Sequence, residues 1–236
     1  MSKKFPKLIE VCPIVDAVIE IRFKTKVPHS AVFGLVYSKL SSEFKSVENL
    51  PILQIPENIR MGDPNLKYKP LYKISNNDFI VQIGPDVLSI SSSPKYVGWQ
   101  KFSKKIFSIL NQIEDLKIIS EVERLGIRYI NFFNQNIFDK IKLEMNLSGE
   151  NILNQKTFIR TQISSGKFLN ILQISNEAIS KNVLGSIIDI DCSKTKGLQD
   201  FFKNKEAIIN EGHLKEKELF FNLLTDEFLK ELKPIY

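Results

Sequence analysis

The stretch from Tyr96 to Phe133 constrains the fold more than any other part of the chain. From Trp99 to Ile113 apolar residues recur at helical spacing, and the lysines lie off that stripe. Residues 121–133 then alternate as a long strand whose apolar face carries Leu125, Ile127 and Tyr129. An amphipathic helix followed by a one-sided strand predicts helices packed against an antiparallel sheet.

The first half of the chain continues this pattern. Residues 15–23 alternate as a half-buried strand, and residues 29–44 carry the apolar stripe of a helix. Residues 68–93 predict three strands joined by an Asn-Asn-Asp turn and a Gly-Pro-Asp turn. A short extended piece, ILQI, is expected within the loop-like residues 45–66.

The second half predicts a hairpin over residues 157–175, a strand over 184–192 and a helical pattern from Gly197 to the end. Because strands do not alternate strictly with helices, the class is α+β and not a parallel sheet. We expect antiparallel sheet with helices on one face, in two loosely similar halves. These halves are residues 1–134 and 135–236, packed as one unit.

The composition is typical of an ordinary globular protein. Among the 236 residues no apolar run approaches the ~20 residues that a membrane-spanning helix needs. The first residues have no apolar segment of the secretory type, and Cys12 and Cys192 are too few for a disulfide framework. We therefore expect a cytoplasmic protein with reduced cysteines. The net charge of +6 is spread along the chain, so it argues only weakly for nucleic-acid binding.

Six pieces carry a resemblance to a known family, and their order along the chain is the order in which that family has them. They are VIEIRF, VQIGPDVLSI, YVGWQKF, LGIRYINFF, SIIDIDC and KELFFNLLTDEF. On these pieces the chain resembles a sporadically distributed prokaryotic family whose function is not established. The resemblance brings no catalytic residues with it. Such a patchy distribution is typical of antiviral defence and toxin–antitoxin genes, and this suggests a component of such a system.

The usual signatures of catalysis are missing from the sequence. It contains no GxxxxGK[ST], GxGxxG, HExxH or GxSxG pattern. His29 and His213 are the two histidines, and each is expected to be a surface or capping residue. The sequence thus favours a binding protein over an enzyme.

Arginines and lysines occupy different parts of the sequence pattern, because most arginines fall in predicted strands. Lysines number 28 and arginines five, and four of those five fall inside predicted strands. A planar guanidinium can hold a carboxylate or a phosphate with two parallel hydrogen bonds. We expect a polar sheet face to bind such a ligand through Arg22, Arg124, Arg128, Arg160 and Glu20.

Asp189 and Asp191 share one face of a predicted strand. Two carboxylates on one face form a weak candidate site for Mg²⁺, which would need substrate oxygens as well. No other cofactor is expected. The competing interpretation is that the arginines and acids of this face are solvated or pair with one another.

The last helix, from about residue 203 to 232, has more apolar positions than one stripe can hold. Either it is buried on two sides or it binds a partner, so we expect a homo-oligomer or a protein partner through this helix. The first hypothesis is accordingly a cytoplasmic interaction protein. The alternatives are a phosphate- or nucleotide-handling enzyme that uses the Arg/Asp face, and nonspecific nucleic-acid binding.

Overall fold

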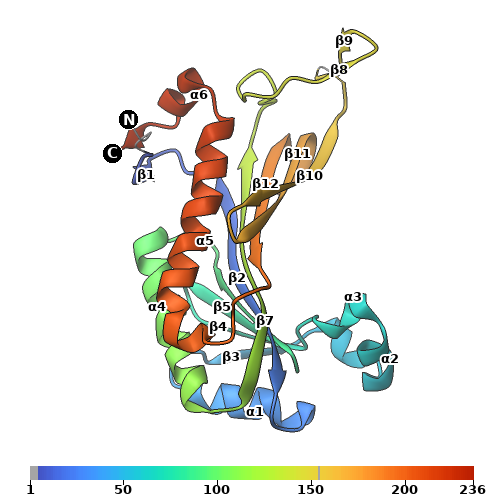
Figure 1. Ribbon diagram of the computed structural model, residues 1–236, viewed down its shortest axis with the longest axis vertical. Coiled ribbons are helices and arrows are strands. Elements are labelled where there is room, and N and C mark those ends of the chain that lie inside the picture. The colour runs from blue at the N-terminus through green and yellow to red at the C-terminus, as the bar shows by residue number, and fades with distance from the viewer. Residues whose placement is uncertain (1–4, 154) are drawn as a thin grey trace. The chain divides into compact units, whose positions relative to one another are not determined.

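The computed structural model describes residues 5–153 and 155–236 (Figure 1). Among these residues nine strands form one antiparallel sheet, in the order β10-β11-β12-β7-β2-β6-β5-β4-β3. The long helices of the described chain are α1, α4 and α5. The predicted α+β class is confirmed.

The chain forms two compact units, and each gathers segments that are distant in sequence. Unit 1 comprises Met1–Asp16, Arg128–Cys192 and Glu211–Tyr236, and unit 2 comprises Ala17–Ile127 and Ser193–Asn210. The predicted halves divide the chain once, near residue 134, whereas the units exchange segments. Four elements contribute residues to both units: β2 (Ile14–Thr25), β7 (Ile119–Phe133), β12 (Val183–Lys194) and α5 (Phe201–Leu223).

Unit 2 contains the predicted meander. Its strands are β3 (Ser46–Asn49), β4 (Tyr72–Ser75), β5 (Phe79–Ile83) and β6 (Val87–Ser92), and β6 pairs antiparallel with β2. The Asn76 side chain accepts hydrogen bonds from the backbone N–H groups of Asp78 and Phe79. This local bond closes the β4–β5 turn, as the Asn-Asn-Asp pattern predicts.

Two helices cover one face of these strands. Helix α1 (His29–Leu40) buries Val32, Val36 and Leu40, and α4 (Trp99–Asp115) buries the predicted apolar stripe from Phe102 to Ile113, whereas Trp99 is only partly buried. The Phe79 ring stacks on Phe102 of α4, with centroids 6.4 Å apart, which ties this helix to β5.

The segment between β3 and β4 differs from its prediction. The piece expected to be extended forms a 3₁₀ turn (Pro51–Gln54), followed by α2 (Glu57–Gly62) and α3 (Pro64–Lys67). Pro51 and Pro64 each occupy a first helical turn, where a missing N–H costs nothing. The prolines thus start helical turns instead of bounding a strand. Tyr68, which was expected within a strand, follows α3.

Unit 1 contains the second predicted hairpin, formed by β10 (Phe158–Ser165) and β11 (Phe168–Ser180). Two short pairs accompany it, β1 (Leu8–Ile9) with β13 (Pro234–Ile235) and β8 (Asn146–Leu147) with β9 (Glu150–Asn151). Helix α6 (Asp226–Glu231) begins at Thr225, whose hydroxyl accepts from the Phe228 N–H. Thr225 is therefore the N-cap of this helix.

The apolar surplus of the last helix is largely buried within the chain. Ile209, Phe220, Phe221 and Leu224 have at most 6% of their surface exposed, whereas Leu214 is 53% exposed. Ile209, Phe220 and Leu224 belong to one stripe of buried positions and Phe221 lies beside it, so burial within the chain accounts for these four residues without burial on two opposite sides. Among the described residues no helix combines the length and hydropathy needed to span a membrane.

Candidate functional site

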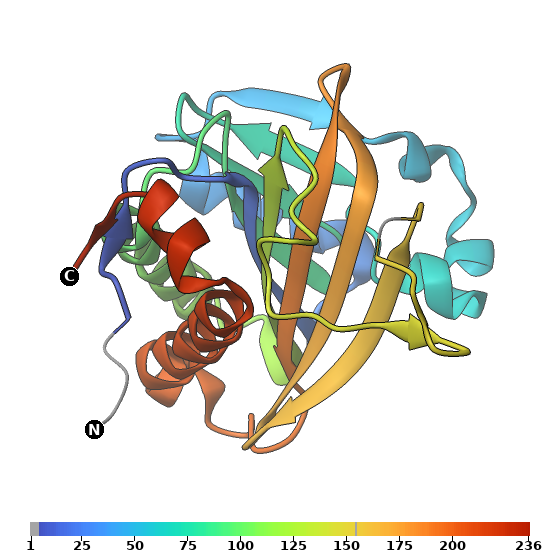
Figure 2. The ribbon, with the colours of Figure 1, turned by 90° about the horizontal axis from the view of Figure 1, so that it is seen from above.

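The two faces of the unit 2 sheet differ in character. Ile19 and Ile21 of β2 are buried, and they alternate with Glu20 and Arg22, which are only partly buried. In both views α4 lies on one side of these strands and the α2–α3 segment on the other (Figure 1, Figure 2). The Glu20 and Arg22 side chains lie on the side of the α2–α3 segment, where Arg22 meets Tyr68.

Arg22 is held at two places. Its Nε donates to Glu20 Oε1 at 2.8 Å, and its guanidinium carbon lies 4.7 Å from the centroid of the Tyr68 ring. Among the described residues, neither Nη group of Arg22 has a hydrogen-bond partner, and 34% of the side chain is exposed. The guanidinium is thus oriented while its outer donors remain available to a ligand.

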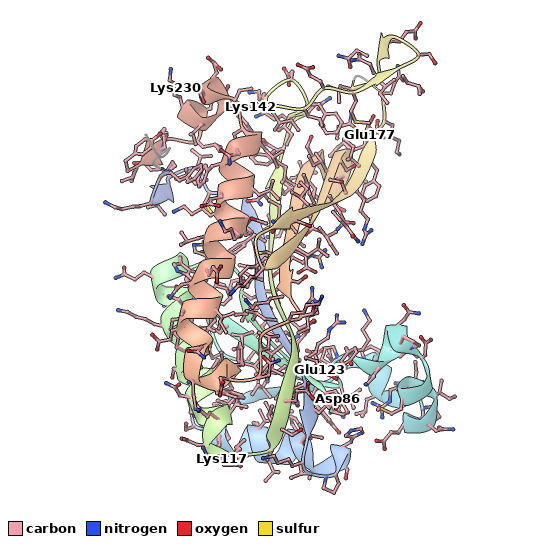
Figure 3. The ribbon with its side chains drawn as sticks, in the orientation of Figure 1. Asp86, Lys117, Glu123, Lys142, Glu177 and Lys230 are labelled. Atoms are coloured by element: carbon pink, nitrogen blue, oxygen red, sulfur yellow. The ribbon has the colours of Figure 1, made fainter. Side chains whose placement is uncertain are left out.

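Tyr68 is fixed in turn by its neighbours. Its hydroxyl donates to Glu123 Oε2 at 3.0 Å, and the Lys67 ammonium lies 4.9 Å from the ring centroid. Lys24 lies 3.5 Å from the other oxygen of Glu123. Figure 3 shows Glu123 beside Asp86 in this region. We call Glu20, Arg22, Lys67, Tyr68, Glu123 and Arg124 together the Arg22 site.

Arg124 completes the site from β7. Its Nη1 donates to Glu20 Oε1 at 3.0 Å, so one carboxylate oxygen joins two arginines. The neighbouring Gly126 makes this possible, because a Cβ at that position would lie 2.3 Å from Arg124 Nη1. A glycine in the strand therefore leaves the space that the guanidinium occupies.

His29 stands at the border of this region between two carboxylates. Its Nδ1 lies 3.2 Å from Glu57 Oε1 and its Nε2 lies 3.5 Å from Asp86 Oδ1. Burial raises the pKa of the Asp86 carboxyl, and the charge of Glu123 adds to the rise, although His29 and Lys67 oppose it. Since both ring nitrogens of His29 face carboxylates, neither is placed to take a proton from a substrate.

Unit 1 holds a different arginine arrangement. Arg128 donates from Nε and Nη2 to the two oxygens of Asp189, at 2.8 and 2.6 Å, and Gln173 donates to Asp189 Oδ2 at 2.8 Å. The hydrogen bond with Asp189 raises the pKa of Arg128, although burial opposes the rise. Arg160 lies directly opposite Gln173 in the β10–β11 register and is exposed. We call Arg128, Gln173 and Asp189 the Arg128 cluster.

Asp189 and Asp191, the residues predicted for Mg²⁺, both lie near Arg128. Asp189 has 7% of its side chain exposed and directs both oxygens to Arg128. Within the described parts of the chain, no group of three or more His, Cys, Asp or Glu residues is placed to hold a metal ion. Asp191 contributes favourable charge to Arg128 instead.

Unit 1 also buries two titratable residues of α5. Glu216 is 5% exposed, and among the described residues its carboxyl has no hydrogen-bond partner. Burial raises the pKa of Glu216 to about 8, although Lys217 opposes the rise. His213 lies 3.2 Å from the Tyr129 hydroxyl, and burial together with the smaller effect of the Lys217 charge lowers its pKa to about 3. Both groups are therefore expected to be neutral at pH 7.

A pocket of about 720 Å³ in unit 2 contains none of the predicted site residues. Two of its three lysines are paired, because Lys101 pairs with Asp78 at 2.7 Å and Lys105 pairs with Glu43, and Lys45 also lines it.

The predicted ligand-binding residues therefore fall into separate groups. Glu20, Arg22 and Arg124 meet in unit 2, Arg128 meets Asp189 in unit 1, and Arg160 is exposed on β10 opposite Gln173. Sequence reasoning missed Tyr68 and Lys67, because they reach the site only through the helical turns of residues 51–67. It also missed Gln173, whose polar position in an apolar strand was the available signal.

Comparison with known proteins adds no family to this description. No protein-family model matches the chain, and no curated protein matches it.

Proposed function

We propose that the protein is a binding module that holds an anionic group, a phosphate or a carboxylate, at the Arg22 site. One observation carries the proposal. Glu20 and the Tyr68 ring fix the Arg22 guanidinium, while its two Nη groups have no partner among the described residues. An oriented guanidinium matches two oxygens of a phosphate or carboxylate, and orientation in advance reduces the entropy lost on binding.

Binding is favoured over catalysis by the surroundings of the site. Both nitrogens of His29 face carboxylates, so a nucleophile lacks a general base of the usual kind. The Arg128 cluster offers less to a ligand, because Asp189 already occupies the guanidinium fork of Arg128. Of the phosphate-handling alternative, we therefore keep the binding of a phosphate at the Arg22 site and not a reaction.

The test is a thermal-shift titration with sodium phosphate, with sodium chloride at equal ionic strength as the reference. The wild type is expected to rise in melting temperature with phosphate, because a ligand that binds only the folded state stabilises it. Arg22→Ala should lose this rise. Arg160→Ala is the matched control, since it removes the same charge from an exposed strand position and should respond as the wild type does.

Two results would contradict the proposal. One is a wild type that does not respond to phosphate, to nucleoside monophosphates or to dicarboxylates. The other is an Arg22→Ala variant whose response equals that of the wild type. Arg22→Lys should bind more weakly than the wild type, because an ammonium keeps the charge but lacks the planar fork.

The cellular setting that we propose is the cytoplasm, as part of a prokaryotic defence or toxin–antitoxin system. The distribution of the resembled family supports this setting. A plaque assay on hosts that carry the locus with wild-type protein or with Arg22→Ala tests it together with the site. Equal phage plating on both hosts and on a host lacking the locus would contradict the defence role.

A further inference from the structure

Strand β10 is the terminal strand in the sheet order, and β11 is its single neighbour in the described sheet. The strand is eight residues long, and most of its side chains are exposed or half-buried. Figure 1 shows it at the outer side of β11. A strand edge of this length presents backbone donors and acceptors to any chain that can pair with it.

The hairpin turn determines which backbone groups face that edge. Ser165 pairs with Phe168 across the two turn residues Gly166 and Lys167, and Gly166 has a φ of 62°. In such a two-residue hairpin the closing pair is hydrogen-bonded, and hydrogen-bonded pairs then alternate along the strand. The N–H and C=O groups that point away from β11 therefore belong to Phe158, Arg160, Gln162 and Ser164.

This edge lacks the usual protection against pairing. Natural edge strands carry proline, lysine, inward-pointing charges or bulges. The sequence FIRTQISS contains no proline, lysine or acid, and its register with β11 is unbroken over all eight residues. Its one charged residue, Arg160, lies across from Gln173, so its side chain stands on the sheet face and does not block the edge.

We infer that β10 pairs antiparallel with β10 of a second copy of this chain, about a two-fold axis at Thr161. This register places Arg160 opposite Gln162 of the second copy, so that a guanidinium meets an amide oxygen and not another arginine. Ile159 lies opposite Ile163 of the second copy, and Thr161 lies opposite Thr161. Such β-branched pairs are favourable neighbours across antiparallel strands.

The apolar core of unit 1 also favours a second copy of this chain as the partner of β10. Ile159 and Ile163 are partly buried and pack against the core cluster that includes Leu172 and Ile174. Pairing in the proposed register would cover their remaining exposed surface with the same two residues of the other copy. An extended peptide of unrelated sequence would not supply this match.

The interface is small, because each copy contributes one strand edge. About eight backbone hydrogen bonds would form between the outward groups of the two strands. Interfaces well below ~1,200 Å² are usually transient. A dimer that dissociates at micromolar concentration is therefore expected.

Sedimentation velocity over a concentration series of the full chain tests the inference. The wild type should shift from monomer to dimer as its concentration rises. Gln162→Pro should remain monomeric while keeping its circular dichroism, because proline removes an outward N–H and leaves the ladder with β11 intact. Gln162→Thr is the matched control and should dimerise like the wild type.

Amide hydrogen exchange locates the interface. Raising the wild-type concentration should slow exchange at Arg160, Gln162 and Ser164, whose amides point outward, more than at Thr161 and Ile163. A wild type that stays monomeric at all concentrations overturns the inference. So does a dimer that survives Gln162→Pro but is lost in Leu214→Asp, since that result places the interface on α5.

Discussion

Arg22 and Arg128 lie on neighbouring strands of one sheet order, yet their guanidinium groups are used differently. Asp189 takes both Nε and Nη2 of Arg128, and Gln173 supports that carboxylate. Glu20 takes only Nε of Arg22, and an aromatic ring supports the guanidinium plane. The first arrangement satisfies a buried carboxylate, whereas the second holds an arginine ready for an external one.

The contrast separates stability from recognition. Asp189 is 7% exposed and depends on Arg128 for compensation of its charge. The Glu20 side chain is 26% exposed, and its carboxylate pairs with Arg124 as well as with Arg22. Unit 1 should therefore be sensitive to changes in charge, and unit 2 should tolerate them while losing its ligand.

The largest expected effect concerns Glu216, the buried acid of unit 1. Since burial raises its folded-state pKa from 4.5 to about 8, the unfolded state binds fewer protons than the folded state over that range. The free energy of unfolding should thus fall as pH rises from about 5 to 8, by roughly 3 kcal/mol from this residue. Glu216→Gln should remove that slope in urea unfolding measured at several pH values.

The control for this experiment is Glu218→Gln, which changes a more exposed acid of the same helix. Its pH dependence should follow that of the wild type. His213 acts in the opposite direction, because its lowered pKa reduces stability as pH falls from about 6.5 toward 3. A Glu216→Gln variant with an unchanged slope between pH 5 and 8 would show that this carboxyl is not buried as described.

The next effect is on the Arg128 cluster. Arg128→Ala should reduce the free energy of unfolding by about 2 kcal/mol, because it leaves the Asp189 carboxylate buried with Gln173 alone. Asp189→Asn should cost less, since Arg128 is 45% exposed and can be hydrated. Denaturant unfolding measures both, with Arg160→Ala as the control. Equal stability of Arg128→Ala and Arg160→Ala would remove the contrast between the units.

The smallest effects are expected at the Arg22 site itself. Arg22→Ala should change the free energy of unfolding by no more than about 0.5 kcal/mol, because the lost ion pair is partly exposed. Tyr68→Phe keeps the ring and should leave phosphate affinity within about twofold, whereas Tyr68→Leu should weaken it about threefold. Calorimetric titration with phosphate measures both. Equal losses in the two Tyr68 variants would assign the role to the hydroxyl instead of the ring.

Much of the fold could be predicted from periodicity. The alternation in residues 121–133 and the stripe from Trp99 to Ile113 place most of their apolar side chains in the core, as observed. The Asn-Asn-Asp turn and the cap at Thr225 are local signals, because the bonds that make them join neighbours in sequence. The helical turns of residues 51–67 were missed, since a proline can stand at a strand boundary or in the first turn of a helix.

The candidate site was less accessible to sequence reasoning. Residue types on strands identified Arg22, Arg124 and Glu20, because alternation fixes which side chains share a face. Partners from other strands were not predictable. That Arg128 meets Asp189 while Arg22 meets Tyr68 depends on strand order and on the path of the α2–α3 segment. Neither the strand order nor the path of this segment produces a periodic pattern in the sequence.

Gly126 gives the Arg22 site a property that its charged residues cannot. A methyl group at this position would collide with the end of a flexible side chain, Arg124, and not with backbone. Gly126→Ala would thus turn one guanidinium away from Glu20 while every ionisable residue stays in the sequence. Position 126 is therefore a place where natural variation could retune ligand preference by redirecting charge, with little penalty to folding.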